Sequence, residues 1–200
     1  NIFSLAVLAS SLVLTATAQA ATYQMCTSYG CNNSSVNPNL SVTSDYAKTQ
    51  YPIVLAHGIS GVAESATNAY WPGIPTGLVE RGASVFLTSV SAYNSSEVRG
   101  EQLLKHVETI VAITNAGKVN LIGQSQGGQG IRYVAAVKPR LVASVTSVAG
   151  AHKGSSVADA IAVPLILGLP LTLIGAPIVN LYFNITDSEK YPQRTLAALS

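Results

Sequence analysis

A serine flanked by glycines stands where the local sequence predicts a strand to end and a helix to begin. Gly123, Ser125 and Gly127 form a GxSxG pattern that follows the apolar run 119–122 and opens a helical stretch. At such a junction the serine takes a strained backbone conformation that lifts its Oγ clear of the sheet, and the residues two positions before and after it must lack a Cβ. The pattern therefore predicts a nucleophile elbow with Ser125 as the catalytic nucleophile.

A serine nucleophile in acyl transfer needs N–H donors for the oxyanion of the tetrahedral intermediate. The helix after Ser125 points unpaired N–H groups at that position, which predicts the backbone N–H of Gln126 as one donor. The loop after the first apolar run, His57-Gly58-Ile59, predicts the N–H of Ile59 as the second. We expect the His57 imidazole to brace this loop, because with this elbow the catalytic histidine follows the serine in the chain. A glycine-rich turn with an idle serine and a phosphate cradle are the alternatives, but for the cradle no lysine stands where a P-loop requires one.

The catalytic acid and base are not identified by the same reasoning. The expected chain order is serine, acid, histidine, yet the only histidine after Ser125 is His152 and no acid lies between them. We therefore leave the acid and base unassigned. The later acids considered are expected to be surface or lid-hinge groups: Asp159, Asp187 and Glu189.

Strand and helix patterns alternate from residue 51 onward. Short apolar runs at 52–56 and 83–90 indicate strands buried on both faces, and two further strands are predicted over 119–122 and 142–148. Capping residues and helical spacing predict a short helix ending at Glu80 and longer helices over 94–115 and 126–138. This alternation predicts an α/β fold with a parallel sheet.

The start of the chain has a different character. An apolar run over 2–14 is shorter than the ~20 residues that a bilayer span needs, and Ala18-Gln19-Ala20 has the small-x-small form of a signal peptidase site. We predict a secretory signal peptide over 1–20, truncated at its start because an initiator Met and a basic segment are absent. Residues 21–50 are rich in Ser, Thr, Asn and Tyr and predict an extended segment of loops or an edge strand.

The composition is apolar and lightly charged. The 200 residues are 48% hydrophobic and 10% charged, with a formal net charge of +2, which excludes disordered and polybasic classes. Lys and Arg are scattered, so nucleic acid is not an expected partner. Export would make Cys26 and Cys31 candidates for a disulfide. Their spacing is neither CxxC nor that of metal ligands, so they predict no redox or metal site.

Blocks of sequence on and around these motifs resemble the secreted bacterial family I triacylglycerol lipases that depend on a dedicated foldase. The blocks lie between Tyr51 and Ser155 and comprise Tyr51-Pro52-Ile53-Val54-Leu55, His57-Gly58, Tyr70-Trp71, Gly73-Ile74-Pro75, Ser96–Leu104, Lys118–Gly123, Ser125, Gly127-Gly128, Ile131–Val137 and His152–Ser155. Two departures stand out. Family members commonly have His beside the serine where this chain has Gln124 and Gln126, and Pro where it has Ala151.

The resemblance implies an α/β-hydrolase fold with a mostly parallel central sheet, helices on both faces and its C-terminal part missing. On this interpretation the chain is an N-terminal fragment whose hydrolase domain, 51–200, is incomplete. The uncharged stretch 160–179 is then a lid-like segment around a hydrophobic opening. Its three prolines oppose a stable transmembrane span, because each costs about 3 kcal/mol in a helix interior. A buried core segment is the other interpretation.

The resemblance also implies the reaction and its partners. It implies a secreted enzyme that passes through the periplasm and hydrolyses esters of long-chain acyl glycerols at an oil–water interface through an acyl-enzyme on Ser125. By the same resemblance Ile59 and Gln126 supply the oxyanion N–H groups and a lipase-specific foldase is a partner. The resemblance also implies that the triad acid, the triad histidine and the calcium ligands lie beyond Ser200. Two other functions stay open: a carboxylesterase for short soluble esters, and a non-catalytic secreted or membrane-associated binding protein.

Overall fold

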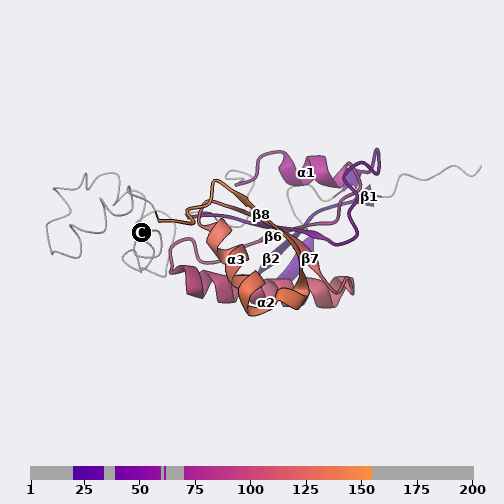
Figure 1. Ribbon diagram of the computed structural model, residues 1–200. Coiled ribbons are helices and arrows are strands. Elements are labelled where there is room, and N and C mark those ends of the chain that lie inside the picture. Colours follow the sequence, from indigo (N-terminus) through magenta and orange to yellow (C-terminus); the bar gives the residue numbers. More distant parts are fainter. Residues whose placement is uncertain (1–19, 34–38, 60, 62–69, 155–200) are drawn as a thin grey trace, which may run out of the picture.

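A six-stranded sheet forms the centre of the computed structural model, which describes residues 20–33, 39–59, 61 and 70–154 (Figure 1). The strand order is β3-β2-β6-β5-β7-β8. All neighbours pair in parallel except β2 and β3, which form an antiparallel hairpin. The strand bounds are Gln24–Thr27 for β2, Gly30–Asn33 for β3, Ile53–Ala56 for β5, Val85–Thr88 for β6, Val119–Gln124 for β7 and Val142–Val148 for β8. The predicted α/β-hydrolase fold with a mostly parallel sheet is confirmed.

The two central strands are buried along their whole length, as their continuous apolar sequences predict. Every residue of β5 and β6 is buried. The parallel register places Val54 beside both Phe86 and Leu121, on the face that packs against the longer helices. Ile53 and Leu55 point to the other face, where Trp71 packs in a second cluster. The sheet thus has one apolar cluster on each side.

Three α-helices cover the two faces of the sheet. Figure 1 shows α1 (Ile74–Val79) on one side and α2 (Ser96–Thr114) and α3 (Gly127–Val137) on the other. The Ser95 side chain caps α2 by accepting from the N–H of Val98, and Asn115 ends α2 in the left-handed conformation with φ 51°. A 3-10 turn, Pro139–Leu141, leads from α3 into β8.

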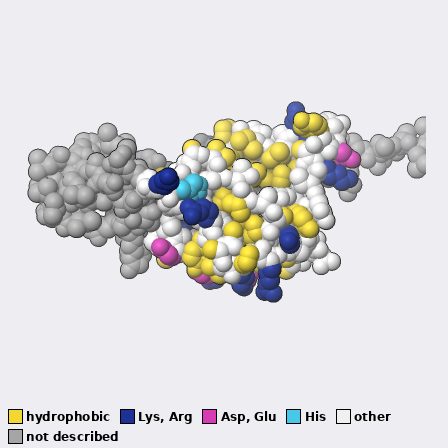
Figure 2. Space-filling view, in the orientation of Figure 1, with side chains coloured by type: hydrophobic (Ala, Val, Ile, Leu, Met, Phe, Trp, Pro, Cys, Tyr) yellow, Lys and Arg dark blue, Asp and Glu magenta, His cyan; other side chains and the backbone are white. Residues whose placement is uncertain are grey.

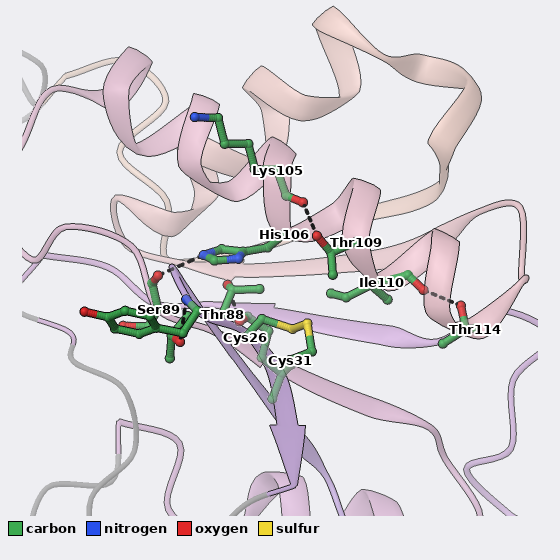
Figure 3. The surroundings of a disulfide bond; sticks show 12 residues. Cys26, Cys31, Thr88, Ser89, Lys105, His106, Thr109, Ile110 and Thr114 are labelled. Carbon is green, nitrogen blue, oxygen red and sulfur yellow. Dashed lines mark hydrogen bonds between the residues drawn. A yellow bond between two sulfur atoms is a disulfide. The ribbon is translucent and has the colours of Figure 1, made fainter.

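The polar N-terminal segment contributes two strands to the sheet. The β2–β3 hairpin has a two-residue tip, Ser28 and Tyr29, and β2 pairs with β6. A disulfide joins Cys26 to Cys31, which face each other across the hairpin (Figure 3). Two short strands, β1 (Ala20–Ala21) and β4 (Leu40–Ser41), pair separately.

The chain changes direction across the sheet between β5 and β7. From β5 it passes through α1 to β6 on one side, and from β6 through α2 back to β7 on the other side of β5. In open parallel sheets the loops at the carboxyl ends of two such strands diverge to opposite faces and leave a crevice where ligands bind. The loop after β5 and the turn after β7, the two segments to which the sequence assigns chemistry, therefore meet at one place.

Several predictions fall on residues that the structure does not describe. The signal peptide up to residue 19, the lid-like segment 160–179, and Asp159, Asp187 and Glu189 lie outside the described residues. Within the described ranges no helix is long and apolar enough to cross a membrane.

Candidate active site

Ser125 occupies a tight turn between β7 and α3. Its φ is 55°, in the left-handed region that side chains other than glycine rarely adopt. Its N–H donates to the carbonyl of Val148 at 3.0 Å and its carbonyl accepts from the N–H of Gly128 at 2.9 Å, so neighbouring elements hold the strained residue on both sides. The residue is half-buried. This is the backbone geometry that the GxSxG pattern predicts.

The two glycines of the pattern lie where strand, helix and neighbouring strand are closest. A Cβ on Gly127 would collide with the carbonyl oxygen of Ala56 at the end of β5, and one on Gly123 would collide with the backbone of Gly127. Both positions have ordinary negative φ. Space, rather than backbone conformation, therefore requires glycine at both positions.

The loop after β5 packs directly on the serine. A Cβ on Gly58 would stand 2.7 Å from the Cβ of Ser125, so only glycine lets this loop approach so closely. The N–H of Gly58 is already engaged, because it donates to the hydroxyl of Tyr70 at 2.8 Å. The N–H groups of Ile59 and Gln126 donate to no acceptor among the described residues. Both N–H groups are thus available to an oxyanion, and their role as oxyanion donors stays a prediction.

His57 is a buried neutral brace of the same loop. Its Nε2 lies 3.2 Å from the N–H of Val90 and so accepts, which leaves the proton on Nδ1 to donate to the carbonyl of Gly58 at 2.8 Å. Burial, together with the nearby Arg99 guanidinium, lowers the pKa of His57 to about 3. Both ring nitrogens are occupied, so the imidazole has a structural role.

Arg99 is a site residue that the sequence reasoning missed. It lies on α2, is only 2% exposed, and donates through Nη2 to the carbonyls of His57 at 2.8 Å and Gly58 at 3.0 Å. Its Nη1 donates to the carbonyls of Ser91 and Ala92. A cation thus fixes the loop that carries Ile59. The available signal was its spacing: Arg99 is four residues before Leu103, on the apolar face of α2.

The two glutamines beside Ser125 tie the turn to its surroundings. Gln124 accepts through Oε1 from the hydroxyl of Tyr70, the same hydroxyl that receives the Gly58 N–H. The Gln126 side chain is 1% exposed, and its Nε2 donates to the carbonyl of Asn94 at 3.0 Å. The Gln126 Oε1 has no hydrogen-bond partner among the described residues. Replacing Gln126 removes the side-chain hydrogen bond to Asn94 and is therefore expected to lower the free energy of unfolding. The predicted oxyanion role uses only the backbone N–H, which any residue but proline retains.

His152 is bound on both of its ring nitrogens at the end of β8. Arg132 lies 3.1 Å from Nδ1, and since a guanidinium only donates, Nδ1 is the acceptor. Nε2 then carries the proton and donates to the Ser147 hydroxyl at 2.7 Å. The Oγ of Ser125 has no hydrogen bond to a described residue. The structure thus does not bring His152 and Ser125 together as a base and its nucleophile.

The part of the chain that the structure describes is expected to hold no calcium ligands, and this stays an expectation. The described residues contain no group of three or more His, Cys, Asp or Glu side chains that could hold a metal.

The chain belongs to the alpha/beta hydrolase fold family, which matches residues 51–170. A triacylglycerol lipase of Vibrio cholerae is 47% identical over 164 residues, which cover 78% of this chain and 51% of that enzyme. A triacylglycerol lipase of Burkholderia plantarii is 43% identical, over 82% of this chain and 48% of that enzyme. The predicted relationship to bacterial triacylglycerol lipases is thereby confirmed.

Solved structures show the same fold at low sequence similarity. A Bacillus licheniformis lipase in its mature form superposes with a TM-score of 0.51 at 20% identity, covering 76% of this chain and 64% of that one. A lipase-esterase related protein of Clostridium acetobutylicum gives 0.50 at 16% identity, covering 78% and 68%. The chain spans about half the length of the curated relatives it matches.

Proposed function

We propose that this chain carries the nucleophile and the oxyanion hole of a triacylglycerol lipase. The observation that carries the proposal is the Ser125 turn, with φ 55° and with the Gly58 loop packed on it. The enzymes from Vibrio cholerae and Burkholderia plantarii, both named triacylglycerol lipase, support the choice of substrate class.

The reaction follows from the positions of these groups. The Ser125 Oγ attacks the ester carbonyl, and the oxyanion accepts from the N–H groups of Ile59 and Gln126. A histidine outside the described residues takes the hydroxyl proton of Ser125 during the attack and returns it to the alcohol as that leaves. Water, deprotonated by the same histidine, then hydrolyses the acyl-enzyme and the proton returns to Ser125. Arg99 and His57 hold the Ile59 loop in place during both steps.

Export is the second part of the proposal. The signal-like residues 1–20 and the Cys26–Cys31 disulfide favour an oxidising, extracytoplasmic location. A lipid ester at an oil–water interface is the proposed substrate. A lipase-specific foldase and calcium are proposed partners of the full-length protein, on the strength of the family resemblance alone.

The substrate class is tested with the full-length protein on emulsified trioleoylglycerol and on a short, soluble nitrophenyl ester. We expect turnover of the emulsion to exceed that of the short ester and to rise as the substrate passes its solubility limit. Activity confined to the short ester identifies a carboxylesterase instead. Absence of both activities, in a folded protein that also resists a serine-directed phosphonate, favours the binding protein.

A further inference from the structure

A polar cavity of about 830 Å³ lies beside the disulfide hairpin, at the same carboxyl edge of the sheet as Ser125. Its walls are the hairpin tip, 27–30, the loop 89–91 that follows β6, and one face of α2. Figure 3 shows Lys105, His106 and Thr109 on α2, with His106 reaching Ser89 above the disulfide. Three strand spacings separate β2 from β7, about 14 Å. The near wall, loop 89–91, follows β6, two strand spacings or about 10 Å from β7, so the cavity lies beside the crevice at Ser125 and shares with it the loop that contacts His57 and Arg99.

Several interactions hold the cavity walls in place. The disulfide closes the hairpin, and the N–H of Ser89 donates to the carbonyl of Cys26 at 2.8 Å. The Gln102 side chain accepts from the N–H of Ser91 at 2.8 Å and donates to its hydroxyl at 2.9 Å. The hairpin tip and the loop are therefore ordered before any ligand arrives, which reduces the entropy lost on binding.

The lining is rich in hydroxyl groups and has few aliphatic side chains. One lining side chain is a cation, Lys105, none is a carboxylate, and Val90 is the one aliphatic side chain among them. An acyl chain would leave such a wall without hydrogen-bond partners, which is costly. The lining side chains with hydroxyl groups are Thr27, Ser28, Tyr29, Ser89, Ser91 and Thr109.

His106 supplies a fixed acceptor among these donors. Its Nε2 lies 2.9 Å from the carbonyl of Ser89, so that nitrogen must carry the proton and Nδ1 is left as an acceptor. The side chain is 8% exposed, and burial lowers its pKa, so the imidazole stays neutral at pH 7. The cavity is therefore lined by a neutral imidazole whose Nδ1 can accept, by an ammonium donor, and by hydroxyl groups, of which that of Thr109 already donates to the carbonyl of Lys105.

The rim adds an aromatic surface. Tyr29, at the tip of the hairpin, is 94% exposed, although its ring is large and largely apolar. A flat ring next to a dense array of hydrogen-bonding groups suits a ligand with one apolar face and many hydroxyls. A sugar ring has an apolar face and several hydroxyl groups. The cavity volume also lies within the range of small-molecule sites.

We propose that this cavity binds a short saccharide, either free or as the headgroup of a glycolipid. The proposal is independent of ester hydrolysis, and it is tested in the full-length protein carrying Ser125→Ala, which removes turnover of the lipid probes. Calorimetric titration uses maltotriose, N,N′-diacetylchitobiose and digalacturonic acid as free saccharides. Vesicles of digalactosyldiacylglycerol, compared with vesicles of phosphatidylcholine, test the headgroup.

We expect at least one free saccharide, or the glycolipid vesicles alone, to bind with a Kd of about 10 mM or tighter. Lys105→Met and Tyr29→Ser should each weaken that binding about tenfold. Both side chains are exposed, so the variants should keep the thermal stability of the parent. Lys118→Met, an exposed lysine outside the cavity, is the matched control and should change nothing. Absence of binding to every probe, or binding that neither variant weakens, overturns the proposal.

Discussion

At the scale of single residues, the candidate site is built from strain and from buried hydrogen bonds. Ser125 is held at φ 55° by hydrogen bonds to Val148 and Gly128, so the direction of its side chain is fixed by the backbone. The loop opposite is held by Arg99 and His57, which lie behind it and are buried. Chemistry is thus assigned to Ser125, and positioning to the residues that surround it.

Arg99→Lys tests the positioning role. Lysine keeps the charge but has a single nitrogen, so it cannot reach four carbonyl oxygens on two loops. In the full-length enzyme we expect kcat to fall about 100-fold through misplacement of the oxyanion donor, with KM nearly unchanged. Arg81→Lys, an exposed arginine that donates to Gly77, is the matched control. An unchanged kcat in the folded Arg99→Lys enzyme would contradict the assignment.

The pKa of His57 gives a prediction about pH. In the unfolded chain this histidine is protonated near pH 6.5, whereas in the folded protein it is protonated only near pH 3. The unfolded state therefore binds more protons in this window, and the free energy of unfolding should fall as pH decreases from 6.5 to 3, by up to ~1.4 kcal/mol per pH unit from this group. Above pH 6.5 its contribution is constant.

Two measurements check the His57 prediction. The Hε1 chemical shift of His57 should not change between pH 8 and pH 5. A histidine with the ordinary pKa of 6.5 titrates in this range, whereas His57 in the folded protein stays neutral. Denaturant unfolding of His57→Gln, whose amide keeps an acceptor for Val90, should lose part of the acid slope. A normal titration of His57 near pH 6.5 would rule out a buried neutral brace.

At the scale of elements, the close approach of β5, β7 and α3 makes the elbow possible. Gly127→Ala should prevent folding or lower the unfolding free energy by more than about 4 kcal/mol, because its Cβ would collide with the backbone of Ala56. Gly130→Ala is the matched control in the same helix. Its Cβ would meet only Leu103 at 3.4 Å, so it should be neutral or stabilising by up to ~1 kcal/mol. Equal stability of the two variants, measured by denaturant unfolding, would refute this packing.

The elements that could be predicted are those with strong local signals. The run 142–148 is β8 residue for residue, and the helix expected over 94–115 is α2 at Ser96–Thr114. The hairpin β2–β3 was harder to predict, because its strands are mostly polar and Cys26 is the one fully buried residue of β2. Its place in the sheet depends on pairing with β6, which no local pattern encodes.

The same division holds for the candidate site. Gly123, Ser125 and Gly127 are adjacent in sequence, so their pattern alone predicts the turn. Arg99 reaches the Gly58 loop from 41 positions away, and that contact exists only after the helix packs. Tertiary contacts of this kind are outside the reach of motif reasoning.

At the scale of the whole molecule, the described residues place no base beside the proposed nucleophile Ser125. His152 is engaged with Arg132 and Ser147, and the chain covers about half of its curated relatives. Residues 21–200 expressed alone should therefore give negligible lipase activity, with at most a remnant of ~10³ over water. The full-length protein, with foldase and calcium present, should be active. Robust turnover by residues 21–200 that His152→Ala abolishes would make His152 the base.

The most direct test of the central claim is the site of covalent labelling by a serine-directed phosphonate. Full-length protein is incubated with the phosphonate and digested, and the modified peptide is identified by mass spectrometry, with Ser125→Ala as the control. We predict a single adduct on Ser125, complete loss of labelling and of ester hydrolysis in Ser125→Ala, and an unchanged unfolding transition in that variant. An adduct on another serine, or ester hydrolysis retained by folded Ser125→Ala, would contradict the assignment of Ser125 as the nucleophile.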